Sequence, residues 1–165
     1  MRPFLIPALA FATAGCATVT PPAITRTVNP GGTIPIATSV RVPAGSDIVF
    51  LSGMLPAVAN PQAPPNTPDS YGDTKTQTAS VLDRLKTALE AEGLTFADVV
   101  SVRVFLVGDP RIGGGMDFAG LNASFGQHFG TAAQPNKPAR TTLQVVALPA
   151  PGALVEIDVV AARPK

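Results

Sequence analysis

The residues best placed to do chemistry are an arginine and a glutamate near the end of the chain. Arg140 begins one apolar segment, residues 140–148, and Glu156 lies in the middle of the next, residues 154–162. A guanidinium keeps its proton and presents a planar fork of donors that matches a carboxylate. A glutamate with apolar residues on both sides needs a partner, because burying a charge alone is costly. Two interpretations are open: a structural Arg140–Glu156 ion pair between neighbouring strands, or a site in which Arg140 binds a carboxylate and Glu156 handles water.

Other polar residues have simpler structural explanations. His128 falls near the end of a predicted helix, where a surface or C-terminal capping role is expected. Asp158 shares a strand face with Glu156 by the period of two and is predicted to be structural or interfacial. Asp117 fits a helix N-cap. The run of glycines at 113–115 lacks the Lys-Ser/Thr that follows a phosphate-binding loop, so a turn is predicted there.

The front of the chain predicts an export signal. Arg2 supplies a positive charge, residues 4–12 are apolar, and small residues precede Cys16. About ten apolar residues are too few to span a bilayer as a helix, which needs about twenty. The predicted organisation is a signal peptide over residues 1–15, a tether rich in Pro and Gly over 16–32, and one domain over 33–165.

Two ways of cleaving this signal leave different N-termini. Residues 13–16 resemble a bacterial lipobox, which would put lipid on Cys16 and hold the protein to a membrane through that anchor only. Ala17 is not Asp, which in a Gram-negative cell favours the outer membrane and a periplasmic protein. The alternative is ordinary cleavage after Ala14, which would leave Cys16 as a free thiol. Both alternatives predict an exported protein.

Composition limits the partners that the chain can have. The formal net charge is +1, with Arg2 among the positive charges, and only 14% of residues are charged. Without a basic patch, nucleic acid is not an expected partner. Cys16 is the only cysteine and His128 the only histidine, so neither an intrachain disulfide nor a Cys/His metal cluster can form. We expect no metal and no organic cofactor.

Hydrophobic periodicity predicts the element order ββαβαββ. The predicted strands are residues 34–42, 48–51, 99–107, 140–148 and 154–162, and the predicted helices are about 74–92 and 118–129. The first two strands are expected to pair as a hairpin. Residues 57–69 contain four prolines and are expected to form a loop that excludes helix. One sheet with both helices on the same side is the simplest α+β arrangement.

The other face of this sheet is also predicted to be apolar. The strand pattern assigns four residues to it, namely Val99, Phe105, Val145 and Val155. Two helices are enough to cover one face only. The economical way to cover the second face is self-association.

The chain contains several short motifs whose order and spacing are specific when they are taken together. They are residues 49–56 (VFLSGMLP), 77–82 (QTASVL), 93–100 (GLTFADVV), 104–106 (VFL), 117–122 (DFAGLN), 138–142 (PARTT) and 151–158 (PGALVEID). In this order and spacing the chain resembles the RidA/YjgF family, the reactive-intermediate (enamine/imine) deaminases, from about residue 34 to the C-terminus. Residues 56–70 look like an enlarged insert after the second strand.

The resemblance implies a chorismate-mutase-like α+β fold, assembled as a homotrimer whose three sheets form a barrel. It implies ligand sites in the clefts between subunits. The family's carboxylate-binding arginine corresponds to Arg140 and its water-associated glutamate to Glu156. Its helix asparagine corresponds to Asn122, and its cleft-lining Ser-Gly segment to Ser52 and Gly53.

Two positions depart from the family pattern. Deaminating members commonly carry a tyrosine on the first strand, whereas residues 34–38 read IPIAT and contain no aromatic residue. The position beside the arginine that is often cysteine is Thr142. Both departures leave the carboxylate-binding arginine in place and bear on which substrate side chain is preferred.

The implied activity is hydrolysis of small enamine or imine acids to 2-oxo acids and ammonia. In that reaction Arg140 would hold the substrate carboxylate, Glu156 would place the water, and Thr142 or the backbone near Gly53 would steady the departing amine. The alternative is a non-catalytic, membrane-tethered trimer that binds small carboxylates. The predicted export favours the alternative, since the family's best-known substrates arise in the cytoplasm.

Overall fold

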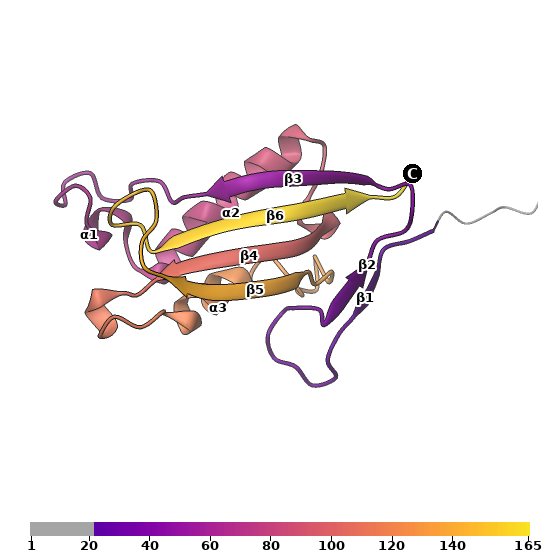
Figure 1. Ribbon diagram of the computed structural model, residues 1–165, viewed down its shortest axis with the longest axis horizontal. Helices are drawn as coiled ribbons and strands as arrows, with labels where there is room; N and C mark the ends of the chain where they lie inside the picture. Colours follow the sequence, from indigo (N-terminus) through magenta and orange to yellow (C-terminus); the bar gives the residue numbers. More distant parts are fainter. Residues whose placement is uncertain (1–21) are drawn as a thin grey trace, which may run out of the picture.

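The computed structural model describes residues 22–165 (Figure 1). The predicted signal peptide, the lipobox and Cys16 lie outside these residues. In the described part, no helix is both long and apolar enough to cross a membrane.

A four-stranded sheet forms the centre of the domain. It consists of β3 (Asp47–Met54), β6 (Val155–Arg163), β4 (Val99–Val107) and β5 (Ala139–Val145), in that order. β6 runs antiparallel to both of its neighbours, whereas β5 is parallel to β4. Helices α2 (Thr74–Ala91) and α3 (Phe118–Phe125) lie together behind the sheet in Figure 1. The predicted α+β class, with one sheet and both helices on one face, is confirmed.

Local sequence signals explain where the two helices begin. The Asp73 carboxylate accepts a hydrogen bond of 2.8 Å from the Thr76 N–H, and Asp117 does the same for Gly120 at 2.8 Å. Gly93 follows the end of α2 with a φ of 67°, a backbone conformation that favours glycine. Helix α3 ends at Phe125, four residues earlier than predicted. Residues 126–129 continue as turns, so that Phe129 still stacks on Phe125 at 4.5 Å between ring centroids.

The core lies between the helices and one face of the sheet. Alternate residues of β4 and β6 are buried there, among them Val102, Val104, Ile157 and Val159. Val99 and Val155 also belong to this core, so their predicted assignment to the open face was wrong. A register shift between Val99 and Ser101 in the pairing with β6 explains the first case, because a shift of one residue exchanges the faces.

The open face of the sheet is apolar at its outer strands. Phe50 on β3 is 77% exposed and Leu143 on β5 is 50% exposed. Phe105 and Val145 alternate away from the buried residues of β4 and from Arg140, as predicted for this face. Within one chain, nothing among the described residues buries these apolar side chains.

The predicted hairpin of the first two strands is wrong. Only Ser39–Arg41 forms a strand (β2), and it pairs with β1 (Thr25–Thr27), which lies in the segment predicted to be a tether. Arg26 fixes β1 to the domain, because its Nη2 donates to the carbonyl oxygen of Ala97 at 3.0 Å. Strand periodicity alone cannot show which of two neighbouring segments will pair with a third.

The proline-rich insert is held in place by the residues around it. It contains a short helix, α1 (Pro68–Tyr71), which the predicted loop excluded; proline is tolerated in the first turn, where its missing N–H is not needed. The short 3-10 helices η1 (Phe96–Asp98) and η2 (Pro110–Ile112) flank β4. Arg111 of η2 binds the buried Asp109 through two nitrogens and donates to the carbonyl oxygen of Gly72, which ties the end of α1 to the sheet.

Candidate active site

Arg140 lies under α3, at the start of the edge strand β5. Its Nη2 donates to Asn122 Oδ1 at 2.9 Å. Its guanidinium carbon lies 4.5 Å from the ring centroid of Phe125 and 5.5 Å from that of Phe118. We call these residues, together with Thr142 on the same strand face, the arginine cluster. Phe118, Asn122 and Phe125 are spaced along one side of α3, so that two rings and an amide surround the cation.

The arginine cluster contains donors that no described group satisfies. Nη1 of Arg140 and Oγ1 of Thr142 are both buried without a hydrogen-bond partner among the described residues. Burial lowers the pKa of Arg140 to about 10, which still leaves the side chain charged at neutral pH. A carboxylate would supply both the missing acceptor and the missing charge.

Glu156 forms a second group with the Ser-Gly segment of β3. The pairing of β3 with β6 shifts between Leu51 and Met54, and Ser52 and Gly53 lie in this irregular stretch. A side chain at Gly53 would overlap Glu156 Oε1, so the absence of Cβ is what lets the carboxylate lie against the backbone there. Glu156, Ser52 and Gly53 are the glutamate cluster below.

The two clusters lie on opposite faces of the sheet. Arg140 pairs with Val102, a buried residue on the helix side, whereas Glu156 follows the buried Val155 and pairs with Phe105 on the open face. In addition, β4 separates β5 from β6. The predicted ion pair between neighbouring strands is therefore excluded within one chain. The same geometry means that one chain does not bring the two predicted catalytic groups together.

Three positions have the structural roles that the sequence predicts: Asp158, Asp117 and Gly113. Asp158 is buried and binds Arg103 through both oxygens at 2.9 Å. Asp117 caps α3, and Gly113 occupies a turn with a φ of 82°. The His128 ring packs edge-on against Phe96 at 5.1 Å, where burial lowers its pKa. His128 is therefore a packing residue between helix and loop rather than a cap.

Sequence reasoning missed the two phenylalanines that flank Arg140. Phe118 and Phe125 are seven residues apart, or two helical turns, and this spacing is the signal that they share a side of the helix. Across residues 22–165, no group of three His, Cys, Asp or Glu side chains is arranged to hold a metal ion.

The chain matches known proteins along most of its length. A family model described as Endoribonuclease L-PSP matches residues 33–163. A RutC family protein of Pyrococcus horikoshii is 35% identical over 124 residues, which are 74% of this chain and 84% of that protein. The chain belongs to the RidA/YjgF family. Protein DfrA of Myxococcus xanthus, another relative, is 39% identical over 127 residues, covering 77% of this chain and 84% of its own.

Solved structures share the fold of this RidA/YjgF domain. A Rid family protein, YyfB of Yersinia pestis, is 26% identical with a TM-score of 0.60, over 84% of this chain and 98% of that one. TdcF of E. coli, solved with bound serine, is 30% identical with a TM-score of 0.54, over 85% and 97%. These likenesses confirm the chorismate-mutase-like fold class.

Proposed function

We propose that this protein hydrolyses small enamine or imine acids to 2-oxo acids and ammonia. The observation that carries the proposal is the arginine cluster: a half-buried guanidinium, flanked by two aromatic rings, whose buried Nη1 has no partner within residues 22–165. Such an arrangement is costly unless a ligand completes it, and a carboxylate is the complementary group. TdcF, a relative that binds serine, supports a ligand of amino-acid size.

The second part of the proposal is that two copies of the chain make each site. Figure 1 shows β3 and β5 at the two edges of the sheet. Ser52 and Gly53 lie on the first edge and Arg140 on the second. If the β3 edge of one copy overlaps the helix side of β5 in the next, the open face that carries the glutamate cluster meets the face that carries the arginine cluster, and both exposed edges are covered. Three sheets joined in this way would close a barrel and cover the exposed Phe50 and Leu143.

The chemistry follows from the roles of the two charged side chains. Arg140 holds the substrate carboxylate, which fixes the position of the neighbouring C=N⁺ carbon. Glu156 accepts a proton from water as the water oxygen bonds to that carbon, forming a carbinolamine. Proton transfer to nitrogen and cleavage of the C–N bond release ammonia and leave the 2-oxo acid. One water is consumed, and no electrons are exchanged.

The composition of this chain does not support the endoribonuclease activity named in the family description. The formal net charge of +1 offers no basic footprint for RNA. The single histidine, His128, packs against Phe96 outside both clusters.

The decisive experiment measures capture of 2-iminopropionate. An amino-acid oxidase generates it from alanine while semicarbazide traps what remains, so a deaminase lowers the yield of semicarbazone. The wild-type protein should lower this yield, Arg140→Ala should not, and Arg41→Ala, which changes an exposed arginine of β2, should behave as wild type. If the wild type binds pyruvate but leaves the semicarbazone yield unchanged, the non-catalytic carboxylate-binding trimer is the correct function.

A further inference from the structure

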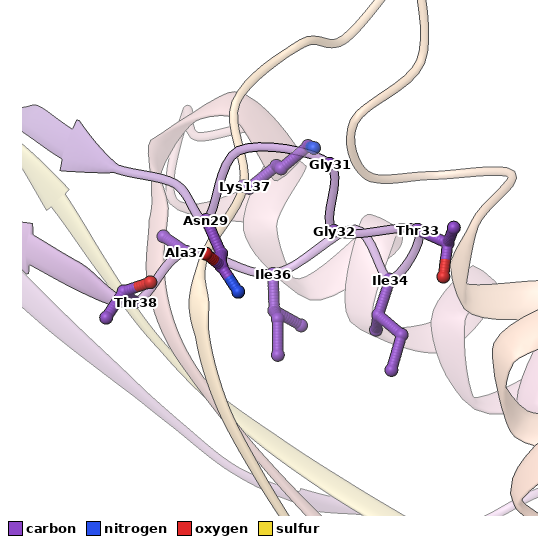
Figure 2. Close-up of a pocket in the computed structure, with 9 residues that line it drawn as sticks. All are labelled: Asn29, Gly31, Gly32, Thr33, Ile34, Ile36, Ala37, Thr38 and Lys137. Carbon is purple, nitrogen blue, oxygen red and sulfur yellow. The ribbon is translucent and has the colours of Figure 1, made fainter.

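A cavity of about 400 Å³ lies beside the start of β5 and belongs to neither cluster. Figure 2 shows its lining: the loop from Asn29 to Thr38 forms most of the wall, and Lys137 comes from the segment that leads into β5. The volume is in the range of small-molecule pockets, about 300–1,000 Å³.

Two features connect the cavity with the segment that leads to Arg140. The Ala37 N–H donates to the carbonyl oxygen of Pro138 at 2.8 Å, which places the loop backbone alongside the chain two residues before Arg140. Lys137 stands three residues before Arg140, a separation of about 10 Å when the chain is extended. A ligand held by its carboxylate on Arg140 would therefore have this cavity within reach of its side chain.

The lining combines apolar side chains with the ammonium of Lys137. Ile34 and Ile36 supply the apolar surface, and in Figure 2 the Lys137 side chain extends toward the turn at Gly31. Within residues 22–165, the ion pairs involve Lys86 and Lys165 but not Lys137. An ammonium at the end of an apolar pocket complements a short methylene chain that ends in a carboxylate.

We propose that this cavity is the side-chain pocket of the site and that the preferred substrates are 2-imino acids of dicarboxylic amino acids, with the distal carboxylate on Lys137. The inference rests on the proposed deaminase function. In a five-carbon diacid the two carboxylate carbons are separated by four bonds of about 1.5 Å each. The long side chains of Arg140 and Lys137 cover the rest of the span. The hydrolysis itself is unchanged, because the distal carboxylate takes no part in bond making or breaking.

The test compares imines made in situ from glutamate, leucine and alanine by amino-acid oxidases, with semicarbazide as the trap. Wild type should show its highest kcat/KM with 2-iminoglutarate. Lys137→Met should lower kcat/KM for this substrate about tenfold to a hundredfold, the range for losing one charged hydrogen bond. Hydrolysis of the leucine and alanine imines should change less than threefold. Lys137→Arg should retain most of the preference, and Lys86→Met, which removes an exposed lysine of α2, should match wild type.

A second measurement separates failure of this inference from failure of the proposed function. Calorimetric titration compares 2-oxoglutarate with pyruvate, the stable products, on the same variants. If the alanine imine is hydrolysed but Lys137→Met leaves both the rates and the binding of 2-oxoglutarate unchanged, the pocket assignment is overturned and the deaminase stands. If no imine is hydrolysed but 2-oxoglutarate binds more tightly than pyruvate and loses that advantage in Lys137→Met, the pocket stands and the deaminase does not.

Discussion

The variant Arg140→Met separates binding of a carboxylate from folding of the domain. Methionine keeps a flexible apolar stem between Phe118 and Phe125 and removes the guanidinium. Had Arg140 been a structural ion-pair partner, its removal would leave a buried charge and cost about 3–5 kcal/mol. Among residues 22–165 no carboxylate forms an ion pair with Arg140, so a different result is expected.

The expected change in stability follows from the contacts of Arg140. The variant loses one charged hydrogen bond to Asn122, about 1.5–3 kcal/mol. It also loses cation–π contacts worth about 0.5–2 kcal/mol. Against these losses, it removes the buried and unpartnered Nη1, which destabilises the empty protein by about 1–3 kcal/mol. The free energy of unfolding should therefore fall by about 1.5 kcal/mol, within limits set by these terms of about 1 kcal/mol gained and about 4 kcal/mol lost.

The assay is thermal unfolding with and without a 2-oxo acid. At a ligand concentration of 100 times Kd, bound ligand adds about 2.7 kcal/mol to the free energy of unfolding. For a domain of this size that corresponds to an increase in Tm of about 5–10 °C. Wild type should show this increase and Arg140→Met should not, although both are folded without ligand. Loss of more than about 4 kcal/mol in the empty variant, or an unchanged increase with ligand, would refute the reasoning.

Four further predictions concern other parts of the molecule. Because burial lowers the pKa of Arg140 to about 10, carboxylate affinity should be constant from pH 7 to 9 and decrease about tenfold per pH unit above 10, measured by calorimetry. Gly53→Ala should displace the neighbouring glutamate and lower kcat about 10²-fold without unfolding, whereas Gly115→Ala, where nothing lies within 4 Å, should match wild type in kcat and Tm. Arg111→Met should destabilise the domain by about 3–5 kcal/mol, because Asp109 stays buried without its partner, and should speed proteolysis within residues 57–72; equal cleavage rates would contradict its role in holding the insert. We propose that Cys16 carries lipid, so labelled palmitate should enter wild type and not Cys16→Ala, and label-free wild type in the soluble periplasm would contradict this.

The sequence predicted the parts of the fold that depend on local patterns. The strand 99–107 and the helix N-cap at Asp117 agree with the structure, because apolar periodicity and capping side chains act within a few residues. The short helix at Pro68 was missed because the density of prolines hid the one position, the first turn, where proline favours a helix. The pairing of β2 with β1 was also missed. The partner of β2 depends on which of several segments pairs with it best, and the residue pattern within one segment does not show this.

The sequence by itself identified the residues that we propose for the chemistry, because an arginine supplies a fixed, planar cation and a glutamate is unusual in the middle of an apolar strand. Only the tertiary structure decided where these residues lie relative to each other. Strand order puts β4 between their strands, and the period of two along each strand directs Arg140 to the helices and Glu156 to the open face. Neither fact can be computed from the spacing of sixteen residues between them. For the same reason, the cavity at Lys137 became visible only when the loop before β2 was found folded against the start of β5.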